Sequence, residues 1–130
     1  VKILPYIIAI IFAINLFIKS GAENFIVKII SPITNKIGLP PELLSLIIVK
    51  PLSGGGSYGI IKTIFENYGP DSYIGRCAAV LMGSAETIFY TSAVYFGSVG
   101  VTNTRYTIKV GLISHAASIF AAIMVCRYMF

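Results

Sequence analysis

The sequence predicts an all-α integral membrane protein, because its composition, its apolar runs and its scattered positive charges all suit a lipid bilayer better than water. Apolar residues make up 56% of the 130 residues and charged residues only 12%, whereas a soluble domain usually carries about 25% charged residues. The mean hydropathy is +0.85. Too few polar side chains are present to cover a globule in water, so we expect one membrane domain over residues 1–130, covered by lipid.

The net charge of +5 is spread along the chain rather than clustered. Single basic residues beside apolar runs are typical of residues that flank membrane segments and contact lipid phosphates. Nucleic acid is therefore not an expected partner, and a solvated basic face is the alternative interpretation of these charges. The residues with this placement are Lys19, Lys28, Lys36, Lys50, Arg105 and Arg127.

The first apolar run extends from Ile3 to Ile18, with Asn15 as its only strongly polar interruption. At about 1.5 Å per residue it just crosses about 30 Å of hydrocarbon if Val1 and Lys19 lie near the interfaces. Lys2 is the only positive charge before the run and no clear cleavage site follows, so we expect a retained span rather than a signal peptide. The chain begins without a methionine inside this run, and we expect an upstream segment to be missing.

An amphipathic helix is expected after Ser20-Gly21, where the first apolar run ends. Apolar side chains recur every three or four residues from Phe25 to Ile33, and charged residues interrupt them, which is the pattern of a helix with one apolar face. We expect Pro32 to break this helix. We also expect it to lie in the interface or to cover its neighbours, with partner binding as the alternative.

The next stretch is predicted to be a re-entrant hairpin of two half-helices. Leu43 to Val49 follows a proline turn and is too short to span a bilayer. The sequence KPLSGGGS, from Lys50 to Ser57, contains a proline and three consecutive glycines that we expect to interrupt the helix. Helical spacing resumes from Tyr58 to Tyr68. Unpaired backbone groups at such a break are tolerated at membrane depth only against protein or water.

A second unit with the same plan follows the turn from Gly69 to Ser72. Tyr73 to Met82 and Ile88 to Phe96 are short apolar segments, separated by the interruption Gly83-Ser84-Ala85-Glu86-Thr87. Paired interruptions of this kind are the best sequence indication of a binding site inside a membrane. The two units share a plan with few identities, so a repeat that relates them is a hypothesis.

The last span is predicted from Tyr106 to Met124, capped by residues between Asn103 and Arg105 after a glycine-rich turn. Asp71 or Ser72 is likewise expected to cap the segment that begins at Tyr73. His115, near the middle of the last span, is expected to be packed and hydrogen bonded, with a proton-coupled role as the alternative.

Glu86 is the residue most strongly expected to carry function. A carboxylate deep in an apolar segment is costly and normally faces a cavity, a cation or a hydrogen-bond partner. Ser84 and Thr87 offer hydroxyls beside it, and a helix break exposes backbone amides at the start of the next helix. The alternative is that Glu86 forms a structural ion pair with one of three basic residues, Lys50, Lys62 or Arg76, or that it lies at the membrane interface.

The predicted binding set joins the two interruptions, because glycine lets backbone approach a ligand closely. We expect it to bind a small polar solute or an ion. The predicted binding residues are Ser53, Gly54, Gly55, Gly56, Ser84, Glu86 and Thr87.

No catalytic residue, metal site or cofactor is expected. The glycine run lacks the Lys-Ser or Lys-Thr that closes a P-loop, and no G-x-S-x-G elbow accompanies Ser84, Glu86 and His115. One histidine without nearby cysteine or carboxylate ligands does not make a zinc site. Cys77 and Cys126 lie in apolar stretches without a CxxC pattern, so we expect two small buried apolar side chains.

Six short motifs occur together in the second part of the chain. They are Pro51-Leu-Ser-Gly54, Tyr68-Gly-Pro-Asp-Ser72, Gly75-Arg76, Met82-Gly-Ser84, Tyr95-Phe-Gly-Ser-Val-Gly100 and Asn103-Thr-Arg-Tyr106. Together they resemble the spore maturation protein B family, over nearly the whole chain and most densely from Pro51 to Gly111. That family carries the nucleoside recognition, or Gate, domain, which concentrative nucleoside transporters and ferrous iron transport protein B also contain. The resemblance therefore implies a transport-like membrane module.

The resemblance carries further expectations about the site and the partners. In nucleoside transporters a Gly-x-x-Glu element in a broken hairpin contacts the nucleoside, and Gly83-Ser-Ala-Glu86 is similar to it with different middle residues. The family also implies a bacterial cell or forespore membrane, dehydration of the spore core, a companion subunit similar to spore maturation protein A, and a longer N-terminus. Assembly of this chain with further copies of itself is an open alternative. The competing hypothesis is a structural or regulatory subunit that transports nothing.

Overall fold

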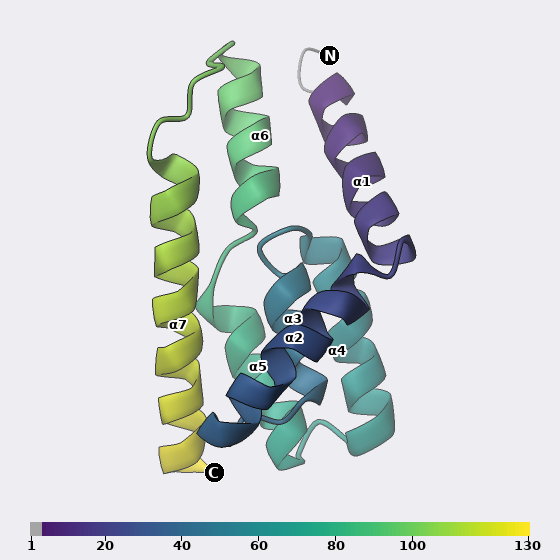
Figure 1. The fold of residues 1–130 in the computed structure, drawn as a ribbon, viewed down its shortest axis with the longest axis vertical. Helices are drawn as coiled ribbons and strands as arrows, with labels where there is room; N and C mark the ends of the chain where they lie inside the picture. The colour runs from purple at the N-terminus through teal and green to yellow at the C-terminus, as the bar shows by residue number, and fades with distance from the viewer. Residues whose placement is uncertain (1–3) are drawn as a thin grey trace.

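The computed structural model describes residues 4–130, and every regular element within that range is a helix (Figure 1). The expectations for Val1, Lys2 and Ile3 fall outside the described residues. The all-α fold is confirmed. The helices are α1 (Leu4–Lys19), α2 (Ala22–Ile37), α3 (Glu42–Val49), α4 (Gly54–Tyr68), α5 (Tyr73–Ser84), α6 (Ile88–Ser98) and α7 (Thr107–Met129).

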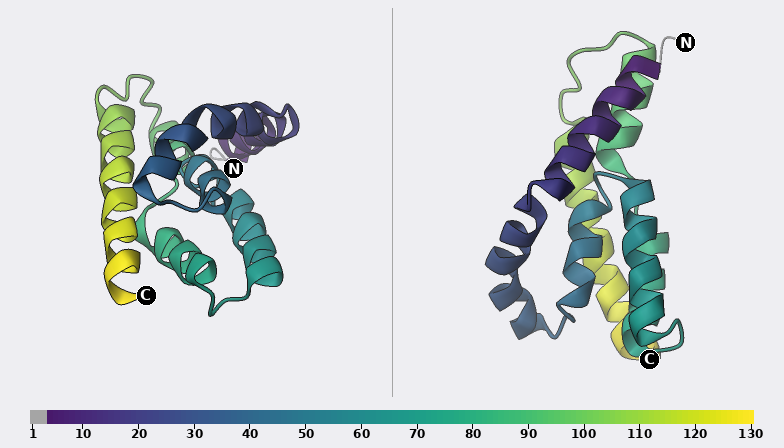
Figure 2. Two further views of the ribbon diagram at one scale, coloured as in Figure 1. Left: turned by 60° about the horizontal axis from the view of Figure 1, so that its bottom comes forward. Right: turned by 90° about the vertical axis from the view of Figure 1, so that its right-hand side faces the viewer.

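The helices are arranged so that the chain interruptions lie near the middle of the molecule's height. In Figure 1, α7 extends along one side of the molecule, α1 and α6 occupy the upper half, and α2 to α5 occupy the lower half. The second view of Figure 2 shows α3 rising to a turn at mid-height and α4 descending from it beside α3. The re-entrant hairpin is therefore present, and α6 continues upward from α5 after a break.

Within residues 4–130, two segments are long and apolar enough to cross a bilayer. One is Tyr73–Ser98, which includes α5, the break and α6, and the other is Thr107–Met129. A third crossing results if α1 and α2 count as one bent span, since the two helices meet at 62°. The 16 residues described for α1 extend over about 24 Å. The molecule is an all-α membrane protein.

The α2 helix is not broken at Pro32, contrary to expectation. It runs through Pro32 to Ile37 without interruption. Pro32 itself is exposed. The Thr34 hydroxyl donates hydrogen bonds to the carbonyls of Ile30, at 3.3 Å, and Ser31, at 3.0 Å, and so keeps this turn hydrogen bonded. The break lies earlier, at Gly21, whose φ of 77° is a left-handed value that glycine adopts without strain.

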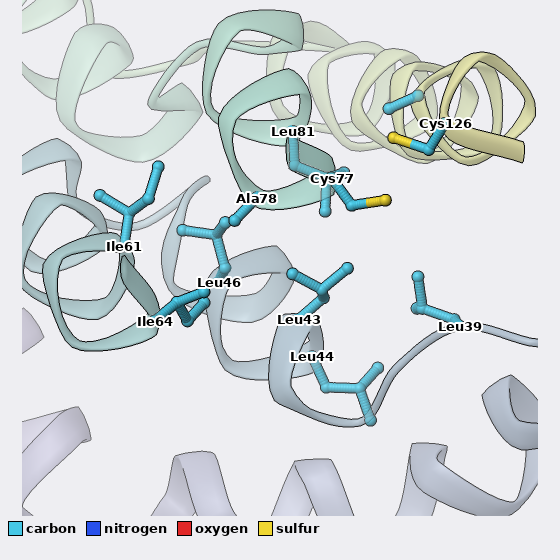
Figure 3. Close-up of a cluster of buried hydrophobic side chains, with 11 residues drawn as sticks. Leu39, Leu43, Leu44, Leu46, Ile61, Ile64, Cys77, Ala78, Leu81 and Cys126 are labelled. Atoms are coloured by element: carbon cyan, nitrogen blue, oxygen red, sulfur yellow. The ribbon is translucent and has the colours of Figure 1, made fainter. Parts of the chain in front are cut away.

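The core lies in the lower half of the molecule and surrounds α3 (Figure 3). Leu43, Leu44, Leu46 and Val49 of α3 are each at most 1% exposed, as expected for a short helix that is apolar on all sides. They pack with side chains of α4, α5 and α7. The remaining core residues are Leu39, Ile61, Ile64, Cys77, Ala78, Leu81, Ala122 and Cys126.

The three glycines after the first interruption are helical, whereas the sequence predicted an unwound stretch. The break comprises Lys50 to Ser53, and Gly54 to Gly56 form the first turn of α4. The Ser53 hydroxyl oxygen accepts a hydrogen bond from the Gly56 amide at 3.0 Å, which is an N-cap bond that stabilises a helix start by about 1 kcal/mol. A Cβ at Gly56 would lie only 3.0 Å from Val49. The glycine run therefore lets α4 begin close against α3.

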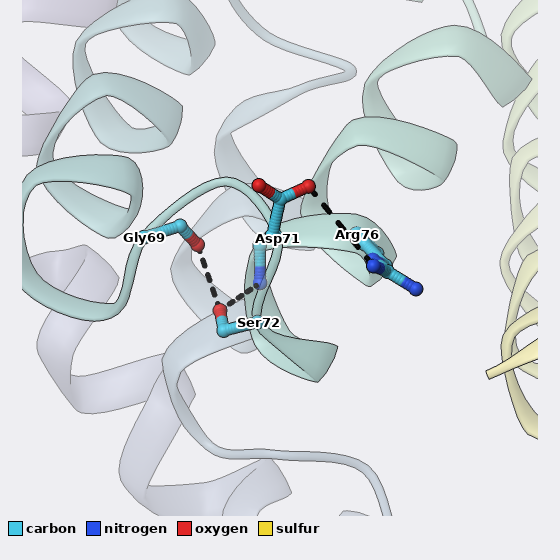
Figure 4. Close-up of polar contacts among 5 residues, drawn as sticks. Gly69, Asp71, Ser72 and Arg76 are labelled. Atoms are coloured by element: carbon cyan, nitrogen blue, oxygen red, sulfur yellow. Dashed lines mark hydrogen bonds and ion pairs between the residues drawn. The ribbon is translucent and has the colours of Figure 1, made fainter.

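The turn between α4 and α5 has the cap that the sequence predicted, with Ser72 in the role (Figure 4). Its hydroxyl accepts from the Gly75 amide at 3.0 Å and donates to the Gly69 carbonyl at 2.8 Å. Arg76 lies 4.0 Å from the Asp71 carboxylate. A Cβ at Gly75 would lie 2.2 Å from the Gly69 carbonyl oxygen, so the turn folds back onto α5 only because this position is glycine.

The last helix has no side-chain cap, contrary to the expectation for residues 103–105. Its N-cap position is Tyr106, and no side-chain bond closes it. The Asn103 side chain accepts instead from the Arg105 amide at 3.0 Å, within a turn where Arg105 has a φ of 49°. An Asn side chain forms such a local turn as readily as it caps a helix, and here the turn uses it.

Candidate functional site

The two chain interruptions contact each other directly. The Phe89 amide, in the first turn of α6, donates a hydrogen bond to the Pro51 carbonyl at 3.0 Å. A Cβ at Gly54 would lie 3.3 Å from the Thr87 methyl carbon. The tip of the α3–α4 hairpin thus packs against the break between α5 and α6, although more than 30 residues separate them in sequence.

Lys50 joins the same two elements through its side chain. Its ammonium group donates to the Met82 carbonyl near the end of α5, and the residue is only 5% exposed. The last carbonyls of a helix have no partner within the helix and carry partial negative charge, so a buried ammonium group is well placed there. Lys50 therefore stabilises the end of α5 at the break.

A cavity of about 400 Å³ lies beside the second interruption, between it and α7. Ser84 and Glu86, both predicted as binding residues, lie in its wall and have exposed side chains. The chain leaves helical geometry at Ala85, which has φ −147° and ψ 160°. This extended backbone separates α5 from α6. The complete lining is Gly83, Ser84, Ala85, Glu86, Ile88, Gly111, Ser114, His115 and Ser118.

Glu86 has no ion pair within residues 4–130, which argues against the structural alternative. Lys62 pairs with Glu66 at 3.8 Å and Arg76 with Asp71 at 4.0 Å. Lys50 is bonded to a carbonyl, and the charge of Glu86 acts on it only from beyond ion-pair distance. The one hydrogen bond that the carboxylate accepts comes from the Thr87 amide at 3.4 Å. Most of its capacity to accept hydrogen bonds is therefore unused.

His115 is packed and hydrogen bonded, as predicted, and it also lines the cavity. Its Nε2 lies 3.0 Å from the Ile47 carbonyl oxygen. A carbonyl only accepts, so Nε2 carries the proton and donates it to α3. The other ring nitrogen, Nδ1, is buried and has no hydrogen-bond partner in the described part of the chain. The imidazole thus ties α7 to the hairpin and leaves one acceptor free.

The structure brings only part of the predicted binding set to this cavity. Ser84 and Glu86 line it, whereas the first interruption does not. Ser53 is occupied as an N-cap, and Gly54 packs against Thr87. The Thr87 hydroxyl lies 3.4 Å from that of Thr91 in α6. The predicted residues absent from the lining are Ser53, Gly54, Gly55, Gly56 and Thr87.

Sequence reasoning missed the α7 half of the cavity. Gly111, Ser114 and Ser118 follow one another at spacings of three and four residues, which places them on one side of a helix. A small and polar stripe along an apolar span was the available signal. A Cβ at Gly111 would lie 2.7 Å from the Ile88 side chain, so this glycine sets how closely α7 approaches the start of α6.

The described residues show no metal centre. Within residues 4–130, no group of three or more His, Cys, Asp or Glu side chains is arranged to hold a metal ion. Cys77 and Cys126 are buried free cysteines, as the sequence predicted, and belong to the core rather than to the cavity.

Comparison with known proteins identifies the family. The family model for Gate, described as nucleoside recognition, matches residues 1–102, which include both interruptions but not α7. Spore maturation protein B from Bacillus subtilis (strain 168) is 38% identical over 129 residues, which represent 99% of this chain and 72% of that protein. No solved structure matches. The chain therefore belongs to the Gate, or nucleoside recognition, family and is a homologue of spore maturation protein B.

Proposed function

We propose that the chain is a transport or gating module that binds a small polar solute or ion in the cavity between the α5–α6 break and α7. The observation that carries this proposal is the position of Glu86, which lines a cavity of about 400 Å³ without an ion pair in the described residues. An ionisable side chain within a membrane segment is costly. A ligand or water in the cavity offsets that cost.

In this proposal the two interruptions have different roles. Ser84 and Glu86 contact the solute together with the α7 side chains of Ser114 and Ser118. The first interruption, from Ser53 to Gly56, supports the second one by packing against it. A change in the hairpin position would then be transmitted directly to the break that holds the binding residues, and this is the gating step we propose.

No catalytic step is part of the proposal. The Gate family is a family of membrane proteins rather than of enzymes. One carboxylate, hydroxyls and an imidazole suit recognition of a polar solute by hydrogen bonds, and no nucleophile and base pair is part of the set.

The name of the relative supports a proposal for the physiological setting. A protein 38% identical to this chain is named for spore maturation, so we place this chain in the forespore or cell membrane of a spore-forming bacterium, with a part in dehydrating the spore core. A companion similar to spore maturation protein A would cover part of its apolar surface. Candidate contact positions are exposed side chains of α1 such as Ile8, Phe12 and Leu16.

The test is solute flux in proteoliposomes, with the chain alone and with the companion protein. Radiolabelled uridine, sodium and methylammonium serve as probes. We expect flux or equilibrium binding of at least one probe, and a loss of roughly tenfold or more in Glu86→Gln, because a charged hydrogen-bonding group is removed. Ser84→Ala should reduce binding less, because it removes a neutral hydroxyl.

Glu66→Gln is the matched control, since Glu66 is an exposed carboxylate on α4 outside the cavity. It should leave binding and flux unchanged. If Glu86→Gln, Ser84→Ala and the control all behave like the unmodified chain, the cavity is not the binding site.

A second candidate is a structural or regulatory subunit that transports nothing. The observation that favours it is the direct contact between the interruptions, where the Pro51 carbonyl and the Phe89 amide satisfy each other. The cavity lies to one side of this contact rather than between the interruptions. In that case Glu86→Gln would leave all probe binding unchanged, and disrupting the hairpin contact would reduce copurification of the companion protein.

A further inference from the structure

The side chains that line the cavity offer mainly hydrogen-bond acceptors and carry one negative charge, and this composition restricts what the cavity can bind. The inference rests on the proposed function, because it concerns the ligand of the same cavity.

Two of the three serine hydroxyls in the lining already donate their protons to backbone carbonyls. The Ser84 hydroxyl donates to the Leu81 carbonyl at 3.0 Å, and the Ser118 hydroxyl donates to the His115 carbonyl at 2.8 Å. A hydroxyl has one proton and two lone pairs. Both oxygens can therefore only accept a further hydrogen bond. Ser114 is the one lining hydroxyl without a side-chain bond in the described residues.

The imidazole of His115 also offers a hydrogen-bond acceptor rather than a donor. Because Nε2 of His115 donates to Ile47, the neutral ring holds a lone pair at Nδ1. That atom is buried without a partner in residues 4–130, and His115 itself is 9% exposed. A buried acceptor without a donor is unfavourable. In its neutral form the His115 ring therefore supplies no free N–H group to the cavity lining.

The lining of the cavity carries a negative charge and no Lys or Arg to balance it. Glu86 is its only charged residue, and neither Lys nor Arg is among the lining residues. The nearby ammonium group of Lys50 is directed to the Met82 carbonyl and does not line the cavity. An anionic ligand would meet a carboxylate and lone pairs without a compensating positive charge, which is a strongly unfavourable arrangement at membrane depth.

We propose that this cavity selects a small monovalent cation, either an ammonium-type ion or an alkali-metal ion, over anions and neutral solutes. One carboxylate balances one positive charge. The absence of a group of three metal-ligating side chains within residues 4–130 argues against a tightly bound divalent metal ion. A volume of about 400 Å³ accommodates an ammonium ion with an organic substituent or an alkali ion with part of its water.

The experiment uses thiol labelling of Ser114→Cys, made in a chain with Cys77→Ala and Cys126→Ala and reconstituted in liposomes. The labelling rate is compared between cationic and anionic methanethiosulfonate reagents of similar size. We expect the cationic reagent to react roughly tenfold faster, because a charged cleft concentrates ions of opposite sign. Adding Glu86→Gln should remove most of this preference, and adding Glu66→Gln should leave it intact.

The two cation sources are separated by protection of the same cysteine at constant ionic strength. Protection by methylammonium identifies an ammonium-type ligand, and protection by sodium or potassium identifies an alkali-metal ion. Protection by uridine or acetate alone, or an anionic preference, would overturn the cation inference while leaving solute binding at the cavity in place. If no reagent reaches the cysteine, both the inference and the proposed site fail.

Discussion

The Pro51 carbonyl at the tip of the hairpin accepts a hydrogen bond from the Phe89 amide of α6 at 3.0 Å. Neither group could be paired within its own helix, because Pro51 lies in one break and Phe89 is in the first turn after the other. In a bilayer each would otherwise need water or a side chain. The two interruptions are therefore tolerated together, since each supplies a partner for the other.

Disulfide trapping should detect this contact in membranes. In a chain without Cys77 and Cys126, the pair Gly54→Cys and Thr87→Cys should form a disulfide on mild oxidation, because a Cβ at Gly54 would lie 3.3 Å from the Thr87 methyl carbon. Cleavage at an inserted protease site between the two positions, followed by gel electrophoresis, reports the link. The pair Gly55→Cys and Thr87→Cys is the control. Equal linking in both pairs would contradict direct packing of the interruptions.

Ser53→Ala should affect stability rather than solute binding. The change removes the acceptor for the Gly56 amide, and loss of an N-cap costs about 1 kcal/mol. Thermal or denaturant unfolding in detergent measures this loss. Ser45→Ala is the control, because Ser45 lies within α3 and its side chain makes no hydrogen bond within residues 4–130. A loss of binding in Ser53→Ala without a loss of stability would instead support Ser53 as a ligand-contacting residue.

Gly75→Ala should be among the most damaging single changes in the chain. Its Cβ would lie 2.2 Å from the Gly69 carbonyl oxygen, so backbone must shift, at a cost of about 3 kcal/mol or more. Gly59→Ala is a matched change in α4 with nothing within 4 Å of the new Cβ, and it should stabilise by about 0.5–1 kcal/mol. Unfolding midpoints in the same detergent compare the two. Similar effects at both sites would show that the α4–α5 turn is looser than described.

Gly111→Ala should push α7 away from α6 and should be rescued at Ile88. The new Cβ would lie 2.7 Å from an Ile88 methyl carbon, which predicts a destabilisation of about 1–3 kcal/mol. Combining it with Ile88→Ala should cost less than the sum of the two single changes, because the clash is removed. Unfolding of the four proteins in parallel gives this difference. Strict additivity would mean that the two side chains do not touch.

Much of the fold could be predicted from the sequence because apolar run lengths and turn residues are local signals. The end of α4 at Tyr68 and the Ser72 cap follow directly from such signals. Proline and glycine misled the prediction in two places. Pro32 lies inside α2, and nothing in the structure explains why the helix continues through it. Gly54 to Gly56 are helical because Ser53 caps this turn and Val49 packs closely against Gly56. The packing of Val49 is a contact that the glycine run itself does not indicate.

The candidate site could be predicted only in part for the same reason. Glu86 and Ser84 stand out because they are polar residues in an apolar segment. The contribution of Ser114 and Ser118 depends on α7 lying beside the α5–α6 break, which is a long-range contact. No local pattern indicates which helix faces that break. The pairing of Pro51 with Phe89 is equally long-range and involves backbone groups, which carry no sequence signal.

The central claim is that the cavity beside Glu86 contains water at membrane depth, and cysteine accessibility at two adjacent α7 positions tests it most directly. Ser114 lines the cavity, whereas Ile113 is 70% exposed and absent from the lining, so lipid should cover it. In liposomes, Ser114→Cys should react with a membrane-impermeant, water-soluble thiol reagent and Ile113→Cys should not, since only an ionised thiol reacts. Equal reactivity at the two positions, or none at Ser114→Cys, would contradict the claim.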